Sequence, residues 1–153
     1  MHDLDDTDLR ILRHMQRDGN LTVSEIAERV GLSQSPCSRR IIQMQQDGII
    51  VGKAVMLDRK KLGFDTEVLV RLKLKSHERS ALDAFSRAIL QIPEIQQGIL
   101  TLGEFDFHLH IIVRSIAHYQ ALMQDKLVNL PNVHEMQSTV VLEVVKEGTS
   151  LPL

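Results

Sequence analysis

The stretch LTVSEIAERVGLSQSPCSRRIIQMQQD, residues 21–47, predicts two short helices joined by a tight turn. In its first half Ile26, Ala27 and Val30 recur at helical spacing, so one face is apolar while the charged residues between them face water. Gly31 follows where the chain must turn sharply, a position that often needs a left-handed backbone. This arrangement is a helix-turn-helix, the motif that places its second helix in the major groove of DNA.

The second helix of this motif has a clear start, because Ser33 or Ser35 can cap it and Pro36 fits its first turn. The residues that we expect to face inward are Cys37, Ile41 and Met44. A supporting helix is predicted over residues 4–17. Its expected inward residues are Leu9, Leu12 and Met15.

Polar and cationic side chains lie on the outward face of the second helix, where they suit phosphates and base edges. Residues 49–57, IIVGKAVML, are rich in β-forming residues around a Gly-Lys turn and predict the hairpin of a winged helix-turn-helix. Arg40 and Lys53 are expected to contact phosphate, although Lys53 could equally be an ordinary turn lysine. The residues assigned to DNA binding are Gln34, Ser35, Pro36, Ser38, Arg39, Arg40, Gln43 and Lys53.

Charge is unevenly distributed along this chain of 153 residues, whose formal net charge is −2. Residues 9–63 hold ten Lys or Arg and five Asp or Glu, a net +5, whereas residues 64–153 hold eight and eleven. Positive charge therefore gathers around the predicted DNA-reading helix, as binding by counterion release requires. The single cysteine excludes an intrachain disulfide and a multi-cysteine zinc site.

Other classes of protein have little support in the sequence. No apolar run approaches the roughly 20 residues of a membrane span, and the start, MHDLDDTDLR, is acidic where a signal peptide would be basic. There is no phosphate-binding glycine loop, no nucleophile elbow and no pair of carboxylates that spacing alone brings together. We therefore expect a cytoplasmic protein that is not an enzyme and has no membrane partner.

The second half of the chain predicts a separate domain, residues 65–153, after a polar linker at residues 58–64. Predicted strands lie at residues 67–75, 95–102, 105–114 and 134–146, and predicted helices at 78–90 and 116–130. The order β-α-β-β-α-β favours an antiparallel sheet with both helices on one face, the ferredoxin-like arrangement. The predicted class is α+β, with a winged helix-turn-helix over residues 1–57. The uncovered sheet face indicates a homodimer or a larger assembly.

Six short motifs are spread over essentially the whole chain: LDDTDLRIL (4–12), EIAERVGLSQSPCSRRI (25–41), DGII (47–50), LG (62–63), GEFD (103–106) and TSLPL (149–153). Together they resemble the Lrp/AsnC family, the feast/famine transcription regulators. The resemblance implies a dimer-based assembly, often an octamer, whose C-terminal domain assembles the particle and senses small molecules, commonly amino acids. At Ser38 relatives often carry a bulky residue such as Trp, which leaves the operator sequence open.

The predicted function is therefore a sequence-specific regulator that binds double-stranded DNA at the nucleoid and responds to a small-molecule effector, an amino acid, without any other cofactor. A low-specificity, DNA-compacting architectural protein is the alternative. By the resemblance, the turn Gly103–Asp106 is the effector loop. An amino acid needs donors for its carboxylate, an acid for its ammonium and an apolar wall for its side chain. The expected effector residues are Leu102, Gly103, Glu104, Phe105, Asp106, Met136, Ser138 and Thr139.

Asp106, His108 and His110 alternate along a predicted strand, so all three would lie on one face of the sheet. Two histidines and a carboxylate could bind zinc or another divalent ion. The histidines could instead form hydrogen bonds in a subunit contact. The sequence leaves both readings open, and no metal is assigned.

Overall fold

The structure, a computed structural model, describes residues 3–148 and 150–153. The chain divides into two compact units. The head unit comprises residues 1–56 together with residues 146–153, and the sheet unit comprises residues 57–145. The last residues therefore pack with the head, whereas the sequence places all of residues 65–153 in the second domain. In the described ranges no helix is long and apolar enough to cross a membrane.

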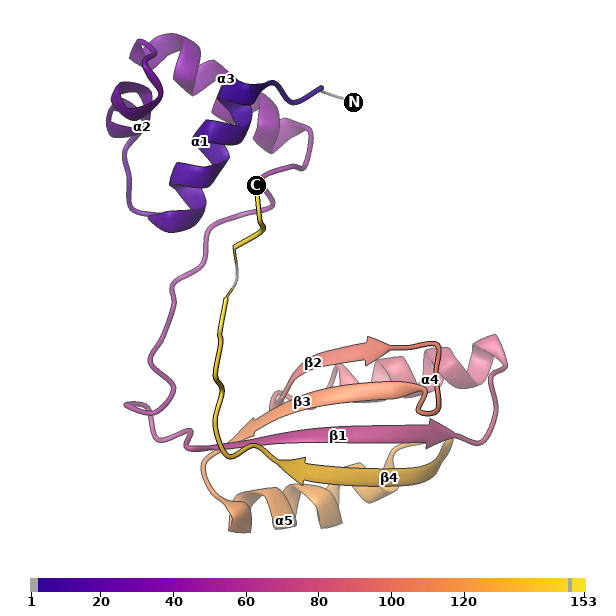
Figure 1. Cartoon of the computed structure of the whole chain (residues 1–153). Coiled ribbons are helices and arrows are strands. Elements are labelled where there is room, and N and C mark those ends of the chain that lie inside the picture. Colours follow the sequence, from indigo (N-terminus) through magenta and orange to yellow (C-terminus); the bar gives the residue numbers. More distant parts are fainter. Residues whose placement is uncertain (1–2, 149) are drawn as a thin grey trace. The chain divides into compact units, whose positions relative to one another are not determined.

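The head unit is a bundle of three helices around a small apolar core. The helices are α1 (Asp6–Arg17), α2 (Val23–Val30) and α3 (Gln34–Gln46) (Figure 1). The core residues are Ile11, Leu12, Leu21, Ile26, Ala27, Val30, Cys37, Ile41 and Met44. The inward face predicted for α3 is thus confirmed, but that of α1 is corrected. Ile11 is fully buried, while Leu9 and Met15 are only half-buried.

The turn between α2 and α3 has the backbone that the sequence predicts. Gly31 is left-handed, with φ 74° and ψ 34°, and its N–H donates to the carbonyls of Ala27 and Glu28. Ser33 occupies the N-cap position of α3, but its side chain forms no capping hydrogen bond there. The hairpin predicted at residues 49–57 is not formed, because this segment contains no strand. The three helices of the motif are nevertheless complete.

Replacing Gly31 with alanine is expected to destabilise the head, since an L-residue pays about 1–2 kcal/mol for a left-handed backbone. The open space around Gly31 leaves this backbone cost as the main effect. Gly19→Ala is the control, because Gly19 also has open space but no left-handed φ. Denaturant unfolding followed by circular dichroism measures both. Equal stabilities of the two variants would show that an alanine at position 31 is not strained.

The sheet unit confirms the predicted β-α-β-β-α-β order. Its elements are β1 (Thr66–Leu74), α4 (Arg79–Ile89), β2 (Ile95–Leu100), β3 (Phe107–Val113), α5 (Ile116–Asp125), the short 3-10 helix η1 (Leu127–Asn129) and β4 (Val133–Val140). The four strands pair antiparallel in the order β2-β3-β1-β4. Both helices lie on the same side of this sheet (Figure 1). The fold class is therefore α+β, as predicted.

Alternating residues of the strands make the core beneath the helices. In β1 the buried residues are Val68, Val70, Leu72 and Leu74, as the sequence predicts. The ring of Phe85 on α4 packs against Phe107 of β3, with centroids 4.6 Å apart. On the opposite, open face Leu69 and Ile99 are 47% and 45% exposed. That face carries apolar surface that no other described residue covers.

The last strand is shorter than predicted. The sequence indicates strand from 134 to 146, but β4 ends at Val140. Val140 pairs with Val68 near the start of β1, and one more bond runs from the Val141 N–H to the Glu67 carbonyl. Beyond that point β1 offers no further partner, so the valine-rich residues that follow leave the sheet.

Candidate functional site

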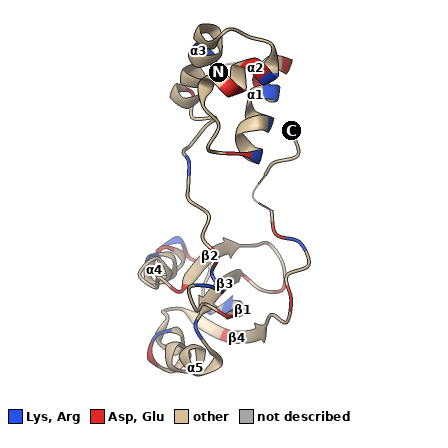
Figure 2. Cartoon of the chain, turned by 90° about the vertical axis from the view of Figure 1, so that its left-hand side faces the viewer, with Lys and Arg blue, Asp and Glu red and all other residues tan. Residues whose placement is uncertain are grey.

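The outward face of α3 carries the side chains that the sequence assigns to DNA. Gln34, Ser35, Arg39 and Gln43 are exposed, and Pro36 and Ser38 are partly exposed. The Gln43 amide donates to the Asp47 carboxylate at 3.0 Å, at the far end of the helix. Lys53 is exposed in the segment that follows α3. Both charge signs occur on the helices of the head unit (Figure 2).

The side chain of Arg40 contacts the start of helix α1. Its Nη1 donates to Asp5 at 2.7 Å and to Asp8 at 2.9 Å. Asp8 is completely buried, and it also forms the capping box of α1 with Asp5. The Asp8 N–H and the Arg40 guanidinium lower the pKa of Asp5. Arg40 therefore holds α3 against α1, a role that the spacing of the aspartates did not reveal.

Arg40→Ala is expected to lower the free energy of unfolding by about 1–3 kcal/mol, because Asp8 loses a charged partner at a buried position. Arg39→Ala is the matched control: it removes the same charge from an exposed position, with an effect within about 0.5 kcal/mol. On DNA the second variant should weaken binding while the fold stays intact. Urea unfolding and DNA titration at fixed salt measure the two effects. A fully stable Arg40→Ala protein would contradict the assigned role.

A cavity of about 710 Å³ lies in the sheet unit, beside the loop that joins β2 to β3. Its lining residues are Lys73, Leu74, His77, Leu82, Leu100, Thr101, Leu102, Gly103, Glu104, Asp106 and His134. The loop comes next to the end of β1 because the Asp106 N–H donates to the Leu72 carbonyl at 2.8 Å. The cavity thus has leucine walls and charged groups of both signs at its edge.

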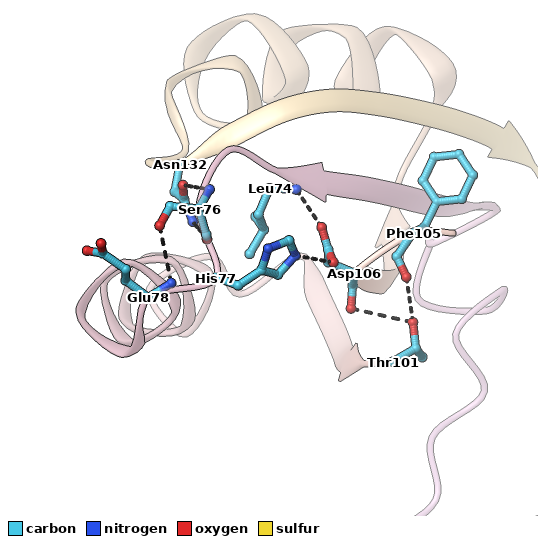
Figure 3. A network of polar contacts seen from close by, with 8 residues as sticks. All are labelled: Leu74, Ser76, His77, Glu78, Thr101, Phe105, Asp106 and Asn132. Atoms are coloured by element: carbon cyan, nitrogen blue, oxygen red, sulfur yellow. Dashed lines mark hydrogen bonds and ion pairs between the residues drawn. The ribbon is translucent and has the colours of Figure 1, made fainter. Parts of the chain in front are cut away.

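Asp106 lines this cavity and takes part in the polar contacts drawn in Figure 3. Its carboxylate accepts from the Leu74 N–H at 2.7 Å and contacts His77 Nε2 at 2.7 Å. Because an ionised carboxylate only accepts, Nε2 carries the proton of that bond. The Leu74 N–H and His77 lower the pKa of Asp106. Both oxygens are thus engaged, and the side chain is only 17% exposed.

Lys73 and Glu104 line the same cavity and form an ion pair. The Nζ of Lys73 lies 3.4 Å from Glu104 Oε1 and 3.4 Å from Glu135 Oε2. Burial opposes the charged form of Lys73, but the two carboxylates outweigh it and raise its pKa. Glu104 is 78% exposed, so one carboxylate at the cavity edge is open to a ligand.

Only part of the predicted effector set lines this cavity: Leu102, Gly103, Glu104 and Asp106. Phe105 is buried, and the Arg71 guanidinium lies over its ring at 4.5 Å. Met136 packs against the core, and the Ser138 hydroxyl is 2.5 Å from that of Tyr119. Thr139 lines a different hollow, on the open face of the sheet.

The sequence reasoning missed the cavity residues contributed by other segments, above all Lys73, His77 and His134. The strand order of the predicted fold was the available signal, because it places the β2–β3 loop beside the end of β1. Residues that lie near the end of β1 in the predicted fold are therefore candidates for lining the cavity, even where they are distant from the loop in sequence.

Asp106, His108 and His110 do not act as one group. The carboxylate of Asp106 is bound to the end of β1 and to His77. His110 instead contacts Glu67 Oε1 at 2.5 Å. Within residues 3–148 and 150–153, no group of three or more His, Cys, Asp or Glu residues could hold a metal ion.

Asp106→Asn is expected to lower the free energy of unfolding at pH 7 by about 1–2 kcal/mol, since charged hydrogen bonds become neutral ones. A lowered folded-state pKa means that this stabilisation is complete above the ordinary value of 3.8 and is lost as the pH falls through the lowered value. The difference from wild type should therefore shrink below pH 3.8. Thermal melts from pH 7 to pH 3 test this. Asp83→Asn, an exposed change on α4, should show no such trend.

These two units define a class of protein: a helix-turn-helix DNA-binding head joined to a ligand-binding domain. Family models agree, with a winged helix-turn-helix DNA-binding domain matching residues 4–51 and the Lrp/AsnC ligand binding domain matching residues 67–151. The chain belongs to the Lrp/AsnC family of transcription regulators.

Individual relatives cover nearly the whole chain. A proline dehydrogenase transcriptional activator of Rhizobium radiobacter is 34% identical over 95% of this chain and 93% of its own length. The leucine-responsive regulatory protein of Escherichia coli K12 is 33% identical, over 97% and 91%. A solved transcriptional regulator of Neisseria meningitidis in complex with L-Met has a TM-score of 0.93 at 31% identity, covering 98% and 97%.

Proposed function

We propose that this chain is a sequence-specific transcription regulator whose DNA affinity responds to a free amino acid. In this proposal residues 1–57 form the DNA-binding domain and residues 58–64 are the linker. Residues 65–153 bind the effector and assemble the particle. The observation that carries the effector assignment is the cavity of about 710 Å³, because leucines wall it and both charge signs reach it. Relatives support it: one is leucine-responsive by name, and one is solved with L-Met.

The cavity has a partner for each part of a zwitterion. Lys73 supplies a cation for the effector carboxylate, and Glu104 supplies an exposed acceptor for the ammonium. Asp106, with both oxygens already bonded, acts by holding His77 and the end of β1 in place. The leucine walls favour an effector with an aliphatic side chain. The finer assignment is therefore an apolar amino acid held by its charged ends.

The DNA partner follows from the exposed face of α3. There Gln34, Ser35, Ser38 and Arg39 can reach base edges or phosphates, with Lys53 as a further cation. Arg40 supports this face from behind. We assign the protein to the nucleoid in the cytoplasm. The open face of the sheet, with its half-exposed apolar residues, is the proposed site of homodimer formation on the way to a larger assembly such as an octamer.

A thermal-shift screen against the twenty amino acids tests the effector proposal, since a ligand that binds only the folded state raises Tm. We expect aliphatic amino acids to raise Tm and acidic ones to have no effect. Glu104→Ala should abolish the shift, whereas Glu143→Ala, an exposed acid outside the cavity lining, should retain it. A normal shift in Glu104→Ala would place the ligand elsewhere. No shift with any amino acid would refute an amino-acid effector.

DNA selection with the same protein tests sequence specificity. A regulator should prefer its enriched sites over random duplex by about a thousandfold or more at fixed salt. Equal affinity for both would favour a DNA-compacting architectural protein instead.

A further inference from the structure

The last four residues described, 150–153 (SLPL), form what we call the tail segment, and they contact α1 within the head unit. The Gln16 amide pairs with both main-chain groups of Leu151: its Oε1 accepts the N–H at 2.7 Å, and its Nε2 donates to the carbonyl at 3.4 Å. Arg13 Nε donates to the main-chain oxygen of Leu153 at 2.8 Å. These contacts fix the register of the peptide along the helix.

Apolar surface surrounds these polar contacts. A hollow of about 450 Å³ is lined by Leu12 and Met15 of α1, by Ile49 and Ile50 after α3, and by Leu153 of the tail segment. Leu153 is 39% exposed, so it is more covered than Leu151, at 68%. Between the two leucines, Pro152 restricts the backbone and so reduces the entropy lost on docking. The tail leucines thus form part of the wall of an apolar hollow, while Gln16 and Arg13 bond to the tail main chain.

Chain connectivity gives this docking a consequence. The chain passes between the head and sheet units twice, at residues 56–57 and again at residues 145–146. If the tail segment were free, only the first passage would restrain the head. When it is docked, the second passage closes a loop and raises the effective concentration of one unit near the other.

We propose that the tail segment is a strap: it binds a dedicated site on α1 and fastens the head unit to the sheet unit at a second point. The same helix begins with Asp5 and Asp8, which hold Arg40 of α3. Earlier in the chain, β4 pairs with β1, whose end borders the effector cavity. Resting on the proposed function, the covalent chain together with these bonds connects the domain that holds the cavity to the helix that carries the DNA-reading face.

Hydrogen exchange of the full-length protein tests the docking directly. The Leu151 N–H is protected by its bond to Gln16. Gln16→Ala keeps a good helix former in α1, so the variant should fold, but the Leu151 amide should exchange about tenfold faster or more. Arg10→Ala is the control, because Arg10 is an exposed residue on the same helix. Equal exchange of Leu151 in the two variants would overturn the strap.

DNA affinity at fixed salt tests the fastening. The double variant Arg13→Ala/Gln16→Ala and the control Arg10→Ala each remove one positive charge from α1, so non-specific electrostatics are matched. On the duplex enriched by DNA selection, the double variant should bind about tenfold more weakly than the control. Equal binding would overturn the fastening role. Failure of wild type and control alike to bind any DNA would refute the regulator proposal, while hydrogen exchange would still test the docking.

Discussion

Pairing of β1 on both of its edges is the constraint on which the sheet unit depends. β1 bonds to β3 on one side and β4 on the other, so its alternating valines and leucines are buried against the helices. The same pairing brings the loop before β3 to the end of β1, where Asp106 donates to Leu72 through its N–H and accepts from Leu74 through its carboxylate. Asp106 therefore takes part both in the pairing at the end of β1 and in the wall of the cavity. The pairing of β1 with β3 thus also positions the cavity wall.

A carboxylate has the corresponding role in the head unit. Asp8 is fully buried, and burial of a charge is costly unless a partner and hydrogen bonds compensate. The Arg40 guanidinium and the Asp5 N–H both bond to it. The interaction therefore specifies how α3 lies on α1 more than it adds net stability. It also gives the two neighbouring arginines different positions: Arg40 contacts the aspartates of α1, and Arg39 is exposed on the face of α3 that we propose for DNA.

The sequence predicts the elements better than the contacts between them. Helical and strand periodicity are local properties of the sequence. The buried face of α3, the alternation along β1 and the order of helices and strands could therefore be predicted from the sequence. The wing and the end of β4 could not, because strand formation needs a partner: Val141 keeps one bond to Glu67, and the described residues 142–146 form no strand. Four residues at the loop assigned by resemblance, 102–104 and 106, do line the cavity. Lys73 and His77 needed a further step, because only the pairing of β1 with β3 brings them beside this loop.

The charged residues at the cavity differ in how many hydrogen bonds and ion pairs they already form within the protein. This number decides which of them is available to a ligand. Asp106 has both oxygens engaged, so binding a ligand ammonium there would require His77 or the Leu74 N–H to lose its acceptor. Glu104 keeps most of its surface in solvent and has one weakly held partner, the Lys73 ammonium at 3.4 Å. A zwitterion that inserts its ammonium toward Glu104 and its carboxylate toward Lys73 exchanges this exposed ion pair for two. The loop can thus take up an effector without breaking the bonds by which Asp106 holds β1.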